Sequence, residues 1–385
     1  MAQINVSNLT FGYEGSYDTI FENVSFSIDT SWKLGFVGRN GKGKTTFLQL
    51  LLGKYEYQGA ITRSVVFDYF PYPVKQKDLE RTAAELMEDW KAGVESWRVL
   101  CELEKLDMDA ELLYRPFGTL SFGERTRVML AVLFSGENDF LLIDEPTNHL
   151  DLETMDWLET YLKAYRGAVL VVSHDRYFLD SVCTRIWELR GKTITTYRGN
   201  YSAYLPQREA ADERLQKQHD ADVEKAAKLQ DYIDRNLVRA STTKMAQSRR
   251  KQLEKLEITE APQAEAHQLN FRFEYDIEPY DELVIMKGLT IRIGERTLLE
   301  ALDYVVHRGD KLIVAGPNGT GKSTLLQVLD GKRRPSGGMV RLGTGAKPGI
   351  FVQQQARRAG RVIDAIWNQY PRFTELEVRS HLARF

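Results

Sequence analysis

Two short segments of this chain combine glycine, lysine and a hydroxyl residue in the pattern G-x-x-x-x-G-K-[ST]. The first occupies residues 38–45 and the second residues 316–323. Glycines let successive backbone N–H groups converge on phosphate oxygens, and the dipole of a following helix adds positive charge. The lysine of such a loop reaches the β- and γ-phosphates, and its hydroxyl residue binds Mg²⁺. A single copy could arise by chance, whereas two matching copies predict a duplicated nucleotide-binding unit.

We therefore expect ATP and Mg²⁺ as ligands. The phosphate-binding residues predicted in the first loop are Gly38, Arg39, Asn40, Gly41, Lys42, Gly43, Lys44, Thr45 and Thr46. Those predicted in the second loop are Gly316, Pro317, Asn318, Gly319, Thr320, Gly321, Lys322, Ser323 and Thr324. Thr45 and Ser323 are the expected metal ligands. Tyr13 is a candidate for stacking on adenine, although an aromatic residue near a strand is often part of the core.

Acids and a histidine follow the first loop. Residues 140–143 are a continuous apolar run, typical of a buried strand, and they end at Asp144 and Glu145. This order predicts that Asp144 binds Mg²⁺ and that Glu145 orients or deprotonates the attacking water. A second buried strand, residues 169–172, precedes His174, which could stabilise charge on the γ-phosphate. The alternatives are structural roles: the acids as a helix cap and the histidine as a packing residue.

A further candidate anion site lies ahead of these acids, where Ser121 precedes a predicted helix over residues 125–133. Ser121 stands at the N-cap position, and with Gly123 it offers hydroxyl and amide donors to an anion. Ser121, Gly123 and the neighbouring Glu124 are therefore candidate ATP-binding residues. Taken alone, the same residues describe an ordinary capped helix.

The two phosphate loops each need a strand before them and a helix after them. Apolar residues 34–37 and 311–315 predict the strands, and residues 46–52 and 324–329 predict the helices. A chain of 385 residues is too long for one ordinary core. We expect an α/β fold with a first domain over residues 1–198, a linker over 199–274 and a second domain over 275–385.

The linker differs from both domains in composition. Alanine, glutamine and charged residues dominate it, and proline is absent between Gln207 and Ala261, which is typical of long exposed helices. The spacing of its apolar residues predicts a hairpin of two helices that pack along a narrow seam, with the turn at residues 239–243. The predicted seam residues are Leu215, Val223, Leu229, Ile233 and Leu237.

Basic residues crowd the predicted turn and the start of the second helix. They are Arg235, Arg239, Lys244, Arg249, Arg250 and Lys251. A run of charge is often only a solvated face, and that alternative stays open. A basic tip on a projecting hairpin, interleaved with hydroxyl residues, suits phosphate contacts to structured RNA.

Bulk composition narrows the class of protein. An apolar fraction of 43% with 28% charged residues is typical of a globular protein, and the net charge of −2 leaves RNA binding to local patches. Two distant cysteines, Cys101 and Cys183, exclude a disulfide framework. The sequence shows neither a signal peptide nor an apolar run of the roughly 20 residues that a membrane helix needs. We expect a cytoplasmic protein with no membrane contact.

The order of these motifs resembles the ATP-binding-cassette (ABC) superfamily. Its signature loop is matched at residues 120–124, its acidic strand and D-loop at residues 140–151, and its switch histidine at His174. Two cassettes joined by a charged helical linker look like the ABC-F family, whose members are ribosome-associated ATPases. The stretch at residues 144–151 and linker residues 239–251 are typical of that family. The resemblance implies the ribosome as partner, with the linker tip near the P-site tRNA and ribosomal RNA.

Within ABC-F, the opening at residues 4–74 looks most like Lsa-type members, which protect ribosomes from antibiotics. The short linker is closer to translation factors. Two positions depart from the ABC pattern. The segment 67–72 has no glutamine where the family usually places a magnesium ligand, and Gln76 is a distant substitute, whereas Gln353 is the expected counterpart in the second domain. Phe122 stands where the signature usually has glycine.

The second domain is expected to be incomplete. The interval from Lys44 to Ser121, carried over to Lys322, runs past residue 385. ABC sites form head-to-tail, so neither site of this sequence is complete within one chain. We therefore expect a truncated ABC-F chain, with ATPase activity in the longer form and a possible homodimer through first domains in this form. The alternatives are the ATPase subunit of a transporter and an inactive scaffold.

Overall fold

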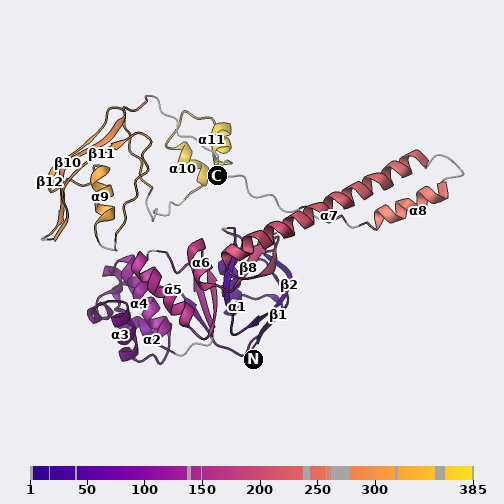
Figure 1. The fold of residues 1–385 in the computed structure, drawn as a ribbon, viewed down its shortest axis with the longest axis horizontal. Coiled ribbons are helices and arrows are strands. Elements are labelled where there is room, and N and C mark those ends of the chain that lie inside the picture. Colours follow the sequence, from indigo (N-terminus) through magenta and orange to yellow (C-terminus); the bar gives the residue numbers. More distant parts are fainter. Residues whose placement is uncertain are drawn as a thin grey trace. The chain divides into compact units, whose positions relative to one another are not determined.

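The computed structural model (Figure 1) describes residues 3–16, 18–39, 41–136, 140–148, 150–236, 243–256, 258–259, 261, 278–294, 296–316, 320–351 and 360–383. These residues form two compact units, one within residues 1–263 and one within residues 264–385. Both units mix strands and helices, as the sequence predicts.

The first unit carries most of the regular structure. Its elements, in chain order, are β1 (Gln3–Phe11), β2 (Phe21–Asp29), β3 (Lys33–Gly38), α1 (Lys44–Leu51), β4 (Gln58–Thr62), β5 (Phe67–Phe70), α2 (Ala83–Trp90), α3 (Ser96–Lys105), α4 (Phe122–Phe134), β6 (Phe140–Asp144), α5 (Leu152–Ala164), β7 (Ala168–Val172), α6 (Arg176–Val182), β8 (Arg185–Arg190), β9 (Thr193–Arg198), α7 (Tyr201–Asn236) and α8 (Thr243–Glu254). Short 3₁₀ turns at Gln76–Glu80, Ala110–Leu113 and Phe117–Thr119 connect the helices around α2–α4.

A six-stranded sheet in the order β5-β6-β7-β3-β8-β9 positions the site. Its strands are parallel except for β9, which pairs antiparallel with β8. Every residue of β6 and β7 is buried, because both faces of the sheet are covered. The strands predicted at residues 34–37, 140–143 and 169–172 are therefore confirmed.

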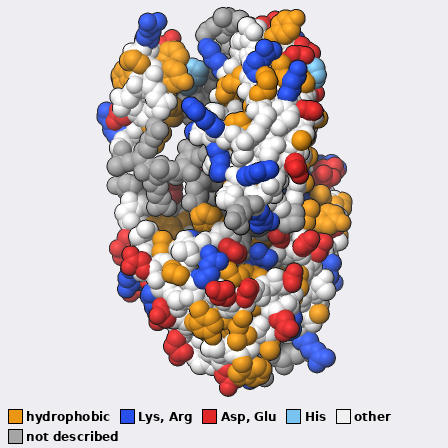
Figure 2. Space-filling model, turned by 90° about the vertical axis from the view of Figure 1, so that its left-hand side faces the viewer, with side chains coloured by type: hydrophobic (Ala, Val, Ile, Leu, Met, Phe, Trp, Pro, Cys, Tyr) orange, Lys and Arg blue, Asp and Glu red, His pale blue; other side chains and the backbone are white. Residues whose placement is uncertain are grey.

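Two apolar layers enclose this sheet. On one face, α1 and the antiparallel sheet β2-β1-β4 pack around Phe36, Phe47 and Trp187. On the other face, α2–α6 pack around residues of α4 and the opposite side of β6 and β7. Acidic and basic side chains are interspersed with hydrophobic ones over the helical layer, in the lower part of Figure 2.

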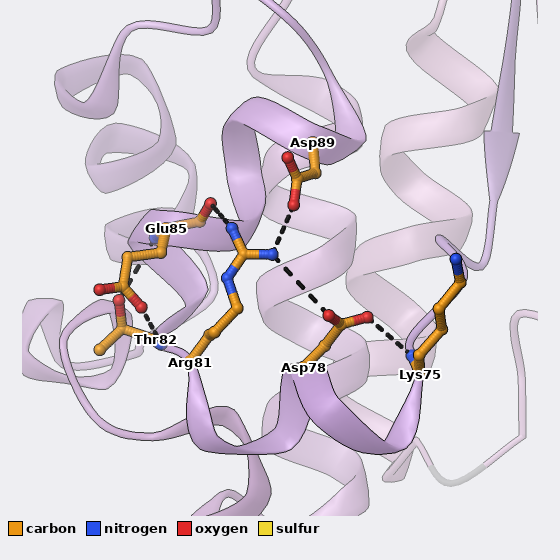
Figure 3. Close-up of polar contacts among 6 residues, drawn as sticks. All are labelled: Lys75, Asp78, Arg81, Thr82, Glu85 and Asp89. Atoms are coloured by element: carbon orange, nitrogen blue, oxygen red, sulfur yellow. Dashed lines mark hydrogen bonds and ion pairs between the residues drawn. The ribbon is translucent and has the colours of Figure 1, made fainter.

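A cluster of polar contacts, one of them through the backbone N–H of Lys75, lies at the start of α2. Its members are Lys75, Asp78, Arg81, Thr82, Glu85 and Asp89 (Figure 3). The Arg81 guanidinium pairs with Asp78 and Asp89 and donates to the Glu85 carbonyl. The Arg81 carbonyl accepts the Phe117 N–H at 2.8 Å, which ties this cluster to the turn that leads into Ser121 and α4.

Helices α7 and α8 form the predicted hairpin, and Figure 1 shows α8 beside the distal part of α7. Leu229 and Ile233 are buried in the seam, as expected. Leu215 and Val223 are not, with 39% and 43% of their surface exposed. That part of the prediction is wrong, because α8 has 12 residues and α7 has 36, so α8 covers only part of α7. Leu237 and most of the predicted turn lie outside the described residues.

The base of α7 is fastened to the edge of the main sheet. The Arg208 Nε lies 3.1 Å from Oε1 of the buried Glu188 on β8, and Arg190 pairs with Asp212. The Gln207 side chain also donates to the Arg198 carbonyl at 2.7 Å. Because β8 pairs directly with β3, the base of the hairpin is one strand away from the strand that leads into the first phosphate loop.

The second unit contains a smaller set of described elements. They are β10 (Glu282–Ile293), β11 (Arg296–His307), α9 (Lys322–Leu329), β12 (Gly337–Leu342), α10 (Val362–Trp367) and α11 (Glu375–Leu382). The strands form an antiparallel sheet in the order β11-β10-β12, and α9 packs on it through Val328.

The strand predicted at residues 311–315 is not formed, and Ile313 is 93% exposed. In the first unit the equivalent strand β3 pairs with β7 and β8, which follow α1 by more than a hundred residues. Among the described residues, no strand pairs with the apolar segment 311–315. The prediction failed because an apolar run becomes a strand only where it has partners.

Candidate nucleotide-binding site

The first phosphate loop connects the end of β3 to the start of α1. Gly43 precedes the helix with φ of 107°, in the left-handed region that favours glycine. A Cβ added at this position would lie 2.3 Å from Cγ2 of Ile20, so the loop requires glycine here for steric reasons as well. Arg39, Gly41 and Lys42 are exposed at the turn of the loop, and Asn40 lies outside the described residues.

The lysine of each loop folds back over the loop. The Lys44 Nζ donates to the carbonyls of Gly38 and Arg39, at 2.7 Å and 3.2 Å. The Lys322 Nζ donates in the same way to the Gly316 carbonyl at 2.6 Å. Burial lowers the pKa of the Lys44 ammonium, while the nearby charges of Glu145 and Asp144 oppose that shift. This desolvated cation is therefore placed where a phosphate would enter the loop.

The second loop repeats the first in its described part. Gly321 precedes α9 with φ of 96°, and a Cβ there would lie 2.7 Å from Cδ1 of Leu298. Ser323 and Thr324 lie in the first turn of α9, and Thr320 stands directly before Gly321. Pro317, Asn318, Gly319 and the predicted ligand Gln353 lie outside the described residues.

Thr45 and Asp144 meet although they are 99 positions apart, and the Thr45 hydroxyl donates to Asp144 Oδ2 at 2.7 Å. Burial raises the pKa of the Asp144 carboxyl, and hydrogen bonds from Thr45 and Tyr69 oppose that shift. A buried carboxylate beside a hydroxyl is a set of hard oxygen donors, which Mg²⁺ prefers. The residues present therefore fit a magnesium ion held together with nucleotide phosphates.

Glu145 and His174 form the next pair, with Glu145 Oε1 3.3 Å from His174 Nε2. Glu145 has φ of 50°, an uncommon value for a residue other than glycine, and its N–H donates to the Val172 carbonyl at 2.8 Å. Uncommon backbone conformations of this kind cluster at functional sites. Burial raises the pKa of the Glu145 carboxyl, while His174 lowers it. A carboxylate held beside an imidazole can accept a proton from water.

Tyr13 lies at the phosphate loop, where its hydroxyl is 2.8 Å from Oγ1 of Thr46. Its ring packs edge-to-face against Phe11 and Tyr55, with centroids 5.2 Å and 5.6 Å away. The sequence analysis did not single out Tyr55. Thr46 itself is buried, and its predicted role in ATP binding stays a prediction.

Ser121, Gly123 and Glu124 lie at the start of α4. Ser121 caps the helix: its hydroxyl accepts the Glu124 N–H at 3.2 Å, and Glu124 Oε2 accepts the Ser121 N–H at 2.7 Å. This capping box occupies the Glu124 carboxylate. Arg125 lies over the Phe122 ring, 5.2 Å from its centroid. The predicted N-cap at Ser121 is confirmed, although the helix begins at Phe122 and not at Arg125. The predicted contact with ATP stays a prediction.

Three of the described basic residues near the predicted tip make contacts within the hairpin itself. Arg235 pairs with Asp231 at 2.9 Å, and Arg250 pairs with Glu254 at 3.1 Å. Arg249 lies over the Tyr232 ring, 4.1 Å from its centroid, and so links α8 to α7. Lys251 is exposed in the last turn of α8. Arg239 lies outside the described residues, and Lys244 is described only as part of the α8 backbone.

Tyr69 is a site residue that the sequence analysis missed. Its hydroxyl lies 3.4 Å from Asp144 Oδ2, the oxygen that also accepts the Thr45 hydroxyl. Burial and then the Asp144 charge raise the pKa of Tyr69 to about 12, so the phenol keeps its proton. The signal lay in segment 67–72, where a glutamine was expected and two tyrosines stand. The other, Tyr72, turns into the core and donates to Asp68 at 3.0 Å.

Comparison with known proteins gives a consistent result. A family model described as ABC transporter matches residues 21–148 and 299–381, and so covers both phosphate loops. A second model with the same description matches residues 187–272, which include helices α7 and α8. None of the helices in the described part of the chain is long and apolar enough to cross a membrane.

Three curated relatives match this chain over most of its length. The putative ATP-binding protein YdiF of Bacillus subtilis (strain 168) is 34% identical, over 100% of this chain and 66% of the relative. The probable ATP-binding protein YheS of Escherichia coli (strain K12) is 32% identical, over 95% of this chain and 63% of the relative. The uncharacterized ABC transporter ATP-binding protein YfmM of Bacillus subtilis (strain 168) is 29% identical, over 100% of this chain and 82% of the relative. The chain thus spans about two thirds of the length of YdiF and YheS.

The family model covers more than half of the chain, and its two matched segments each contain a phosphate loop that runs into a helix, as the geometry requires. The chain therefore belongs to the ABC transporter family, whose ATP-binding domain it carries twice.

Proposed function

We propose that this protein is an ATP hydrolase of the ABC-F type that acts on the ribosome in the cytoplasm. Lys44 and the loop amides bind the phosphates of ATP, and Thr45 with Asp144 holds Mg²⁺ beside them. Glu145 accepts a proton from the attacking water, and His174 stabilises charge on the γ-phosphate. In the second domain, Lys322 and Ser323 take the places of Lys44 and Thr45.

The observation that carries the ribosomal role is the hairpin of α7 and α8. The hairpin directly follows β9 of the first domain, and Arg208 near its start forms an ion pair with Glu188. Its distal part bears Arg235, Arg249, Arg250 and Lys251. A long, polar helical pair with basic side chains at its far end suits contact with RNA phosphates. The resemblance to ABC-F proteins implies where such a tip binds, and we propose that it reaches the P-site tRNA and the ribosomal RNA around it.

Two ABC-F roles fit this proposal: that of a translation factor and that of a protein that protects ribosomes from antibiotics. The resemblance of residues 4–74 to Lsa-type members favours protection, and the short linker favours the translation factor. The ATPase subunit of a transporter is the second candidate function, because relatives such as YfmM are described as ABC transporter ATP-binding proteins.

Co-sedimentation with ribosomes tests the proposal. The protein at its full natural length should pellet with 70S ribosomes in the presence of a non-hydrolysable ATP analogue, and at least about tenfold less should pellet with ADP, because ATP closes the cassettes. Purification from detergent-solubilised membranes provides the contrasting measurement. A stable membrane-protein partner, together with no ribosome pelleting in either nucleotide state, would favour the transporter subunit.

For the 385-residue chain, we propose a homodimer in which each first domain lends Ser121 and Gly123 to the Lys44 loop of the other copy. ATP hydrolysis should then rise faster than linearly with protein concentration, because the active species is a dimer. Ser121→Arg should abolish the activity, since its bulk and charge would fill the anion site. Hydrolysis per molecule that stays constant over a hundredfold range of concentration would argue for a monomeric catalyst.

A further inference from the structure

Tyr69 lies beside the magnesium site on a strand whose role the family pattern does not cover. Strand β5 pairs in parallel with β6, and Tyr69 stands opposite Leu142 in that register. Directly paired residues of parallel strands point to the same face of the sheet, and Asp144 follows Leu142 on that face by two positions. The phenol of Tyr69 therefore extends along the sheet toward the Asp144 carboxylate.

Its surroundings fix this direction. The Tyr69 ring is half-buried in the apolar layer between the sheet and α1, and the Lys54 ammonium lies 5.4 Å from the ring centroid. The hydroxyl lies 3.4 Å from Asp144 Oδ2, while the Thr45 hydroxyl lies 2.7 Å from the same oxygen. Hydrogen bonds at catalytic sites are often long before ligands bind and shorten in the loaded state.

We propose that Tyr69 is a positioning residue for magnesium: its hydroxyl donates to Asp144 and holds that carboxylate toward the metal, in a segment that lacks the usual glutamine. Outer residues of this kind orient the ligands of a metal, and their loss typically lowers metal affinity by about 10- to 100-fold. The inference rests on the proposed binding of Mg²⁺–ATP at the first loop. It concerns metal affinity and makes no statement about the ribosome.

The test measures the magnesium dependence of nucleotide binding. All variants carry Lys322→Ala, so that nucleotide binds at the first loop, and a fluorescent ATP analogue is titrated in EDTA and at increasing Mg²⁺ concentrations. Tyr69→Phe removes one hydroxyl and keeps the ring. It should raise the Mg²⁺ concentration that gives half of the maximal increase in binding of the ATP analogue by about 5- to 10-fold. The affinity for the analogue in EDTA should change less than twofold.

Tyr72→Phe is the matched control, because the Tyr72 hydroxyl bonds to Asp68 on the other side of the sheet, and its magnesium midpoint should equal that of the parent. Urea unfolding of each variant measures its stability, and so distinguishes a loss of packing from a loss of Asp144 positioning. A Tyr69→Phe midpoint within twofold of the parent, with or without a loss of stability, would overturn the assignment. If the parent itself binds no nucleotide, the proposed function of this site fails, and the inference fails with it.

Discussion

Glu145→Gln should slow ATP hydrolysis at the first site by about 100-fold or more, as expected for the loss of a general base. The amide has nearly the same shape as the carboxylate but cannot accept a proton from water. Lys44, Thr45 and Asp144 are unchanged, so the affinity for Mg²⁺–ATP should stay within about twofold. Phosphate release in a single turnover, with the second loop silenced by Lys322→Ala, measures the effect in the protein at its full natural length.

Glu153→Gln is a suitable control, since it makes the same chemical change on an exposed residue of the first turn of α5. It should leave turnover unchanged. Because the closed state of Glu145→Gln cannot be reset by hydrolysis, the variant should also stay on ribosomes and inhibit growth. Turnover above a tenth of the wild-type rate would show that another group accepts the proton.

Removal of the basic side chains at the hairpin tip should weaken ribosome binding and flatten its dependence on salt. The variant replaces Arg239, Lys244, Arg249 and Arg250 with Ala. Each lost phosphate contact should reduce the slope of log K against log salt by roughly 0.7 to 0.9. ATP affinity should not change, because α8, which carries Arg249 and Arg250, lies beside the distal part of α7. Pelleting assays at several salt concentrations measure both quantities.

A matched variant removes four positive charges from positions of α7 that lie outside the predicted basic tip. It replaces Arg214, Lys217, Lys225 and Lys228 with Ala. It should keep most of the binding and most of the salt slope. Circular dichroism of both variants is needed, because Arg249 also packs on Tyr232 and Arg250 pairs with Glu254. Equal binding and equal salt slopes in the wild type and the tip variant would reduce the tip to a solvated face.

The sequence predicts those parts of the fold that depend on neighbours along the chain. The local sequence alone determines the strand at the apolar residues 140–143 and the loop formed by the glycines around Lys44. The structure contains both. The wrong predictions depend on distant partners. Residues 311–315 form no strand without paired neighbours, and Val223 stays exposed because α8 does not reach it.

The residues of the candidate site also fall into those that local sequence predicts and those that depend on distant partners. The phosphate loops, Asp144 and Glu145 were found because spacing alone indicates their chemistry. The contact between Tyr69 and Asp144 joins residues 75 positions apart, through the pairing of β5 with β6. No local pattern marks a tyrosine for that contact, since most half-buried tyrosines in strands only pack.

Because α7 is attached to strand β8 close to the phosphate loop, a small tilt at this attachment produces a large displacement at the distal end of the hairpin. A helix of 36 residues is about 54 Å long at a rise of about 1.5 Å per residue. The part of α7 from Arg208 to Asn236 makes up about 42 Å of this length, so a tilt of about 10° at the contact of Arg208 with Glu188 would move the distal end of α7 by about 7 Å. Small adjustments between β3 and β8 can thus become displacements of several ångströms at the distal end of α7.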